Sequence, residues 1–74
     1  MMFQLWEIES ANLVGSYETE DAALVVVCKA IEKHGREAVE SIMLLREGSR
    51  GRLTTIAEGA ALADRALSRT SPAA

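Results

Sequence analysis

One cysteine and one histidine are the residues of this chain best suited to nucleophilic or metal chemistry, and both fall in one predicted helix. Cys28 and His34 are six residues apart, which separates them by about 9 Å along a helix axis. A nucleophile must hydrogen-bond to its base, so the two do not form a catalytic pair. They also fall short of the four ligands of a structural zinc site. We therefore expect no catalytic residue, no metal and no cofactor, and we interpret the chain as a non-enzyme.

Acidic residues dominate the first part of the chain. Residues 1–28 contain five of them and neither lysine nor arginine, and the formal net charge of the whole chain is −3. Glu7 and Glu9 are expected on one solvated strand face, and Glu20 and Asp21 at a helix start, so neither pair indicates acid–base catalysis. A polyanion needs a basic face to bind. Nucleic acid is therefore not an expected partner, and no small-molecule substrate is inferred.

Three arginines surround one predicted hairpin turn. Arg46 and Arg52 flank the turn, and Arg50 lies in its tip. Guanidinium groups bind phosphate and carboxylate well, so the cluster is a candidate contact for an anion or a partner protein. Binding of nucleic acid through this hairpin is the weakest of the functions considered. The alternative is a purely solubilising role, because Glu47 lies among the arginines and charged tips protect strand edges.

Two β-hairpins are indicated by segments rich in aromatic and β-branched residues. The expected strands are residues 3–9, 13–17, 41–46 and 52–57. Ser10 to Asn12 supply the first turn, because Asn tolerates left-handed backbone and Ser can bond to its own backbone. Two glycines, at positions 48 and 51, supply the second turn. The strand at 41–46 is almost entirely apolar in its middle and is expected to be the most buried.

A long helix is expected between the hairpins, from Thr19 to His34. Thr19 is a suitable N-cap and Gly35 a suitable residue after the helix end. The β-branched run at 24–27 leaves a strand as the alternative there. A short Ala-rich helix is expected at 58–67. The apolar stripe of the long helix and the inner strands predict the core residues Leu24, Val27, Ile31, Ile42, Leu44 and Ile56.

The fold class that follows is α+β, with the order ββαββα. We expect residues 1–67 to form one two-layer domain, in which the long helix packs on a face of a four-stranded antiparallel sheet. Residues 68–74 lack apolar periodicity and contain Pro72, which predicts a disordered tail. The chain carries no apolar run long enough to cross a membrane and no basic, apolar leader, and its lone thiol favours the cytoplasm. A cytoplasmic protein without membrane contact is expected.

A partner chain is the expected source of additional stability. A domain of this size buries a small share of its surface, and neither a disulfide nor a metal is available here. Phe3 and Trp6 fall on opposite faces of the first strand, and Val25 and Val26 fall outside the apolar stripe of the long helix. We expect at least one of these four residues in a homodimer interface. The leading interpretation is a protein-interaction domain that self-associates or serves as the small subunit of a heteromer.

The stretch from Gly15 to Lys33 resembles the HicB-like antitoxins and uncharacterised small bacterial domains with a ββαββ layout. The resemblance covers about 20 residues: a strand end, a Thr-acid-acid-Ala-Ala helix start and an Ala-Ile-Glu helix end. It implies a small bacterial domain in which a helix packs on a small sheet. It also implies an alternative function, an antitoxin-like regulator that neutralises a partner protein.

Overall fold

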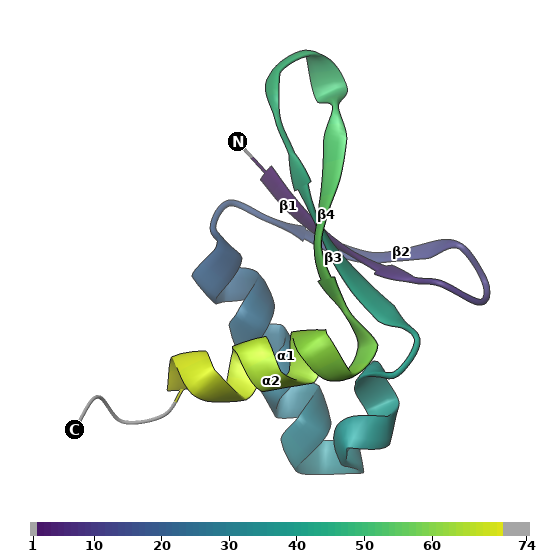
Figure 1. The fold of residues 1–74 in the computed structure, drawn as a ribbon, viewed down its shortest axis with the longest axis vertical. Helices are drawn as coiled ribbons and strands as arrows, with labels where there is room; N and C mark the ends of the chain where they lie inside the picture. Colours follow the sequence, from purple (N-terminus) through teal and green to yellow (C-terminus); the bar gives the residue numbers. More distant parts are fainter. Residues whose placement is uncertain (1, 71–74) are drawn as a thin grey trace.

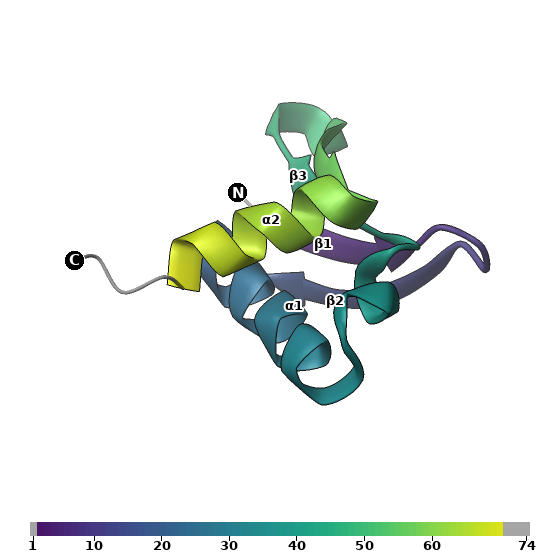
Figure 2. The ribbon, with the colours of Figure 1, turned by 60° about the horizontal axis from the view of Figure 1, so that its bottom comes forward.

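A four-stranded antiparallel sheet with two helices on one face forms the molecule (Figures 1 and 2), and the computed structural model describes residues 2–70. This arrangement confirms the predicted α+β fold and the order ββαββα. The elements are β1 (Met2–Glu7), β2 (Asn12–Tyr17), α1 (Glu20–His34), the 3₁₀ turn η1 (Arg36–Val39), β3 (Ile42–Glu47), the 3₁₀ turn η2 (Ser49–Gly51), β4 (Leu53–Glu58) and α2 (Gly59–Thr70).

The strand order is β2-β1-β3-β4, so the first strand of the chain lies inside the sheet. β1 pairs antiparallel with both β2 and β3, and Leu5 lies directly opposite Leu44. Side chains alternate between the two faces of a strand, so this register fixes which residues face the helices. Leu5 and Leu44 face them, and the side chains one position away face the other side of the sheet.

Capping residues fix both ends of α1. The backbone N–H of Ala22 donates to Oγ1 of Thr19 at 3.1 Å, and the N–H of Gly35 donates to the carbonyl of Ile31 at 2.7 Å. Gly35 has a φ of 84°, which a residue with a side chain rarely adopts. These interactions outweigh the strand preference of the β-branched run at 24–27, and the segment is helical.

The core lies between the sheet and the two helices. Its largest fully buried side chains come from both layers and from η1: Leu5, Leu44, Leu62 and Val39. Of the predicted core residues, the ones buried as expected are Leu24, Val27 and Leu44. Three others are only partly buried and pack against the cluster: Ile31, Ile42 and Ile56. Residues of α2 and η1 occupy the core in their place: Leu62, Ala63, Ala66 and Val39. The sequence shows the first three on one side of the second helix, but none of the four was among the predicted core residues.

Small side chains let α1 and α2 pack closely. Ala23, Ala63 and Ala66 are at most 1% exposed, and the thiol of Cys28 donates to the carbonyl of Ala66 at 3.1 Å. Cys28 is thus a buried contact between helices, as its position at the edge of the apolar stripe suggests.

Two ion pairs at the surface join α2 to the elements against which it packs. Arg36 contacts Asp64 at 2.7 Å, and Arg65 pairs with Glu20, so each pair joins α2 to α1 or to η1. The hydrogen bond to Glu20 raises the pKa of the Arg65 guanidinium above its ordinary value. The guanidinium is therefore charged at every pH at which the domain is studied.

The second helix is longer than predicted. It begins at Gly59 and ends at Thr70, whereas the sequence pattern placed its end at Leu67 and the start of a tail at Ser68. Residues 68–70 contain no helix breaker, and the first proline of the chain comes at position 72. Thr70 is also the last residue that the structure describes. The rest of the predicted tail, residues 71–74, lies outside the described residues.

Candidate interaction surfaces

An apolar band crosses the face of the sheet that carries no helix. Trp6 on β1 lies directly between Leu13 on β2 and Met43 on β3. Leu45 follows Met43 on the same face of β3, and Leu53 on β4 is its diagonal neighbour across the strand pair. We call this face, opposite to Leu5 and Leu44, the open face.

The side chain of Trp6 is hydrogen-bonded to a residue of its own strand. Its indole Nε1–H donates to Oε1 of Gln4 at 2.8 Å, two residues away on the same face. Gln4 lies opposite Leu45, so the bond directs the indole toward that leucine. Leu45 is only 8% exposed, yet it does not belong to the core cluster between the sheet and the helices. We infer that neighbouring side chains on the open face bury it. The open face thus has a packed apolar centre of its own.

The four residues predicted for an interface occupy different surroundings. Phe3 lies on the helix-facing side of β1 and packs against the core, as does Val26 of α1. Val25 is 36% exposed on α1, and Trp6 lies on the open face. The structure therefore places a single one of the four on the open face. Periodicity alone does not distinguish the two faces of β1, because Phe3 and Trp6 are both aromatic.

Val26 is less exposed than its helix phase suggests, because β2 and η1 approach that side of α1. A small apolar depression of about 80 Å³ lies there, lined by Leu5, Val14, Val26, Val27, Ala30, Ala38, Val39 and Ile42. Val26 therefore packs against the core, although it falls outside the apolar stripe of the helix. The depression is too small for anything beyond a side chain or a few water molecules.

Both outer strands of the sheet carry a β-bulge. In β2 the extra residue is Val14, because Leu5 pairs with Gly15 and Trp6 with Leu13. The extra residue in β4 is Ile56, between the partners of Leu44 and Leu45. A bulge interrupts the regular row of backbone groups that another strand needs for pairing. Edge-to-edge contact with another sheet is disfavoured on both sides.

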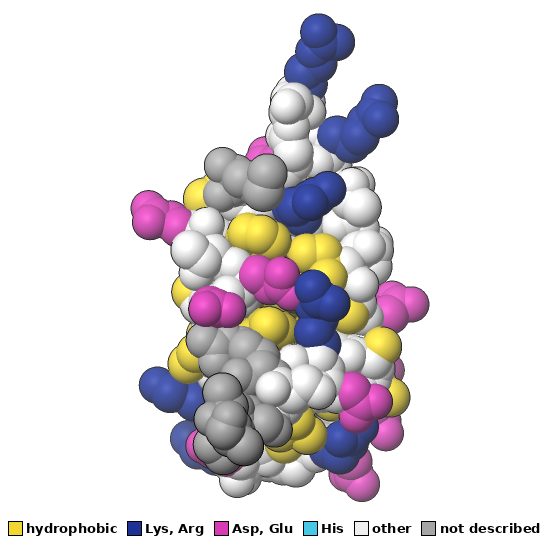
Figure 3. All heavy atoms as spheres, turned by 60° about the vertical axis from the view of Figure 1, so that its left-hand side comes forward, with side chains coloured by type: hydrophobic (Ala, Val, Ile, Leu, Met, Phe, Trp, Pro, Cys, Tyr) yellow, Lys and Arg dark blue, Asp and Glu magenta, His cyan; other side chains and the backbone are white. Residues whose placement is uncertain are grey.

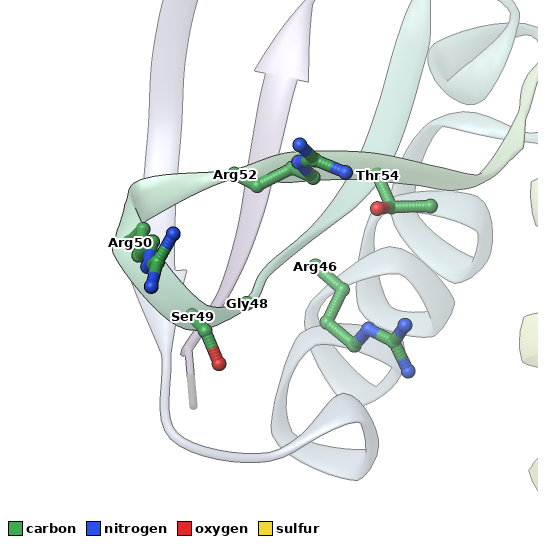
Figure 4. A pocket seen from close by; sticks show the side chains of 6 residues that line it. All are labelled: Arg46, Gly48, Ser49, Arg50, Arg52 and Thr54. Atoms are coloured by element: carbon green, nitrogen blue, oxygen red, sulfur yellow. The ribbon is translucent and has the colours of Figure 1, made fainter.

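The β3–β4 hairpin projects beyond the helices and carries the predicted arginines (Figure 1). Basic side chains gather at this end of the molecule in Figure 3. A solvent-open depression of about 600 Å³ is lined by Arg46, Gly48, Ser49, Arg50, Arg52 and Thr54 (Figure 4). The structure thus brings the three predicted arginines to one surface. Thr54 and Ser49 were not predicted, because single hydroxyl residues in a strand and a turn give no sequence signal.

Alternation along the hairpin separates its charges. Arg46 lies opposite Thr54, and Arg52 precedes Thr54 by two residues, so these three lie on the helix-facing side of the hairpin. Glu47 lies opposite Leu53, which puts the carboxylate on the other side. Glu47 therefore does not separate Arg46 from Arg52, although it is next to Arg46 in the sequence.

The described part of the chain contains no group of three or more potential metal-ligating side chains. None of the described helices has the length and apolar character required to cross a bilayer. Comparison with protein-family models, with curated proteins and with solved structures finds no match to this chain. The resemblance to HicB-like antitoxins and the function that it implies stay predictions.

Proposed function

We propose that this chain is a non-catalytic protein-interaction domain that forms a homodimer through the open face of its sheet. The observation that carries the proposal is the apolar band formed by Leu13, Trp6, Met43, Leu45 and Leu53. Such a band, on a sheet face without a helix, is typical of a surface that another chain covers.

The exposed area of the band sets the strength of the expected dimer. Leu13 is 49% exposed and Leu53 is 46% exposed. Burying a whole leucine side chain contributes about 1.5–3 kcal/mol, so covering the exposed half of each contributes about 1 kcal/mol. Two-fold symmetry counts each residue twice, which gives about 4 kcal/mol before Trp6 and Met43 are included. Association itself costs at least about 4 kcal/mol, so the net free energy depends on Trp6 and Met43. A further gain of about 4 kcal/mol from these two residues in both copies corresponds to a weak dimer with a Kd in the millimolar range.

A second copy of the chain is the occupant that the shape of the band favours. In a two-fold symmetric dimer the same surface of both copies meets itself. When the two-fold axis runs along or across a linear apolar band, the bands of the two copies face each other and each is covered by the other. The bulges at Val14 and Ile56 disfavour association through the sheet edges. A 74-residue domain without a disulfide also gains from additional burial.

Sedimentation equilibrium over a dilution series tests the homodimer. The wild type is expected to change from monomer to dimer as its concentration rises toward the millimolar range. Leu13→Lys and Leu53→Lys each remove apolar burial from both copies and place two charges in the contact. A loss of about 1.5 kcal/mol per copy weakens dimerisation roughly a hundredfold. Both positions are half exposed, so circular dichroism is expected to show folded variants.

Val25→Lys is the matched control, because Val25 is an exposed apolar residue on α1, away from the band. It is expected to dimerise like the wild type. A wild type that stays monomeric at every concentration would overturn the homodimer. Dimers that persist in both Leu→Lys variants would place the interface elsewhere on the domain.

A further inference from the structure

We propose that the helix-facing side of the β3–β4 hairpin binds a phosphate-bearing small molecule. Arg46, Arg52 and Thr54 form this site, which we call the arginine face, and Arg50 lies at its rim (Figure 4). The arginine face does not overlap the apolar band, so this proposal does not depend on the homodimer.

Arg46 and Arg52 occupy neighbouring positions on the two arms of the hairpin. Arg46 lies opposite Thr54, and Arg52 follows diagonally on the same side of the hairpin. Diagonal neighbours on a strand pair are about 7–8 Å apart, within reach of one another for side chains as long as arginine. Like charges at such positions repel, and a bound dianion would convert that repulsion into two attractive contacts.

Among the described residues, no carboxylate forms an ion pair with the arginines of this face. Both ion pairs found among the described residues use other arginines, Arg36 and Arg65. Glu47, the acid next to Arg46 in sequence, lies on the opposite side of the hairpin. Its carboxylate points toward the tip, since a Cβ built on Gly51 would lie 4.0 Å from Glu47 Oε2. The arginine face is thus left without a charge partner from the described chain.

Arg50 lies at the tip of the hairpin, at the rim of the arginine face. Its φ of 63° and ψ of 24° place it in the left-handed region, which glycine or asparagine adopts more readily than arginine. Ala11, in the turn of the first hairpin, has a similar φ of 55°, so this conformation is required by the turn and not by the side chain. The guanidinium of Arg50 is one of the groups that line the depression.

The chemistry of the site favours phosphate. Guanidinium groups match phosphate oxygens in pairs of parallel hydrogen bonds, and hydroxyl groups such as those of Thr54 and Ser49 donate to the same oxygens. The depression is open to solvent, so a ligand there would be held by charge rather than by enclosure. A long nucleic acid would extend past the hairpin toward a chain with a net charge of −3, which disfavours it. A di- or triphosphate group is therefore the expected ligand class.

Isothermal titration of the full chain with tripolyphosphate, in low salt, is the first measurement. We expect saturable binding of one tripolyphosphate per chain and weaker binding of inorganic phosphate, because fewer charges contact the guanidinium groups. Amide NMR shifts are expected to concentrate in residues 46–54. Arg46→Gln and Arg52→Gln are each expected to weaken binding about tenfold, as the loss of a charge-assisted hydrogen bond does. Lys29→Gln removes the same charge from an exposed site on α1 and is expected to change affinity less than twofold.

Arg50→Gly separates binding from stability. The glycine relieves the left-handed conformation, so the melting temperature is expected to stay unchanged or to rise, while the affinity for tripolyphosphate falls. Equal losses of tripolyphosphate affinity in Lys29→Gln and Arg46→Gln would show that binding depends only on the net charge of the domain. That result would overturn the proposed site. Tighter binding of a single-stranded oligonucleotide than of tripolyphosphate would replace the proposed ligand with nucleic acid. The proposal would also be overturned if tripolyphosphate showed no saturable binding at low salt.

Discussion

A leucine-to-alanine pair provides a sharp test of the two faces of the sheet. Leu44 on β3 is fully buried at 0% exposure, and Leu53 on the neighbouring β4 is 46% exposed. The same chemical change at both positions therefore removes a core contact in one variant and an open-face contact in the other. The comparison controls for the intrinsic effect of replacing leucine by alanine in a strand.

The expected magnitudes differ widely. Leu44→Ala is expected to cost about 3–5 kcal/mol, since the rigid layer of α1 and α2 above it cannot collapse fully into the cavity. The free energy of unfolding of a 74-residue domain is about 4–11 kcal/mol, at 0.05–0.15 kcal/mol per residue. Leu53→Ala is expected to change this free energy by less than about 0.5 kcal/mol in the monomer.

Thermal unfolding followed by circular dichroism measures the difference. One kcal/mol shifts the melting temperature of so small a domain by about 4–8 °C, so Leu44→Ala is expected to lower it by at least about 12 °C. Leu53→Ala is expected to lower it by less than about 4 °C. The protein concentration must be kept low, because dimerisation would stabilise the folded state. Equal shifts in the two variants would refute the assignment of the two faces.

Two further predictions concern backbone positions. Thr19→Ala removes the hydrogen bond from the Ala22 N–H to Oγ1 and is expected to lower the free energy of unfolding by about 1 kcal/mol, measured by urea denaturation; an unchanged midpoint would contradict the cap. Gly59→Ala is expected to cost about 1–2 kcal/mol, because φ is 58° and the new Cβ would lie 3.3 Å from the carbonyl oxygen of Glu40. Gly48→Ala, with a φ of −97°, is the control and is expected to be nearly neutral; similar losses in the two glycine variants would argue against strain at Gly59.

Local chemistry made the element order predictable. Thr19, Gly35 and the acidic first turn define α1 by interactions within a few residues, and these outweighed the β-branched run at 24–27. Both hairpins follow from turn residues between apolar segments. In the first turn the left-handed residue is Ala11, with a φ of 55°, and not Asn12, which is the first residue of β2. Where a signal was absent the prediction failed, as at the end of α2, which continues to Thr70.

Features that depend on distant partners were not predictable. The place of β1 between β2 and β3 depends on pairing between residues some 40 positions apart in the chain. That pairing decides which face of β1 the helices cover, and thus that Trp6 and not Phe3 lies on the open face. It also decides which strands are outer ones and therefore where the bulges fall. The arginine cluster was visible in the sequence, but the separation of Glu47 from it depends on hairpin register.

The interior position of β1 has a consequence for how the chain folds. β1 is made first, yet its pairing with β3 is complete only when Glu47 has been added, since Met2 lies opposite Glu47. The first hairpin and α1 therefore precede in the sequence the strand that completes the central seam of the sheet. Closing that seam orders a long loop, and contacts of such separation slow folding. We infer that formation of the β1–β3 seam, rather than of either hairpin, limits the folding rate of this domain.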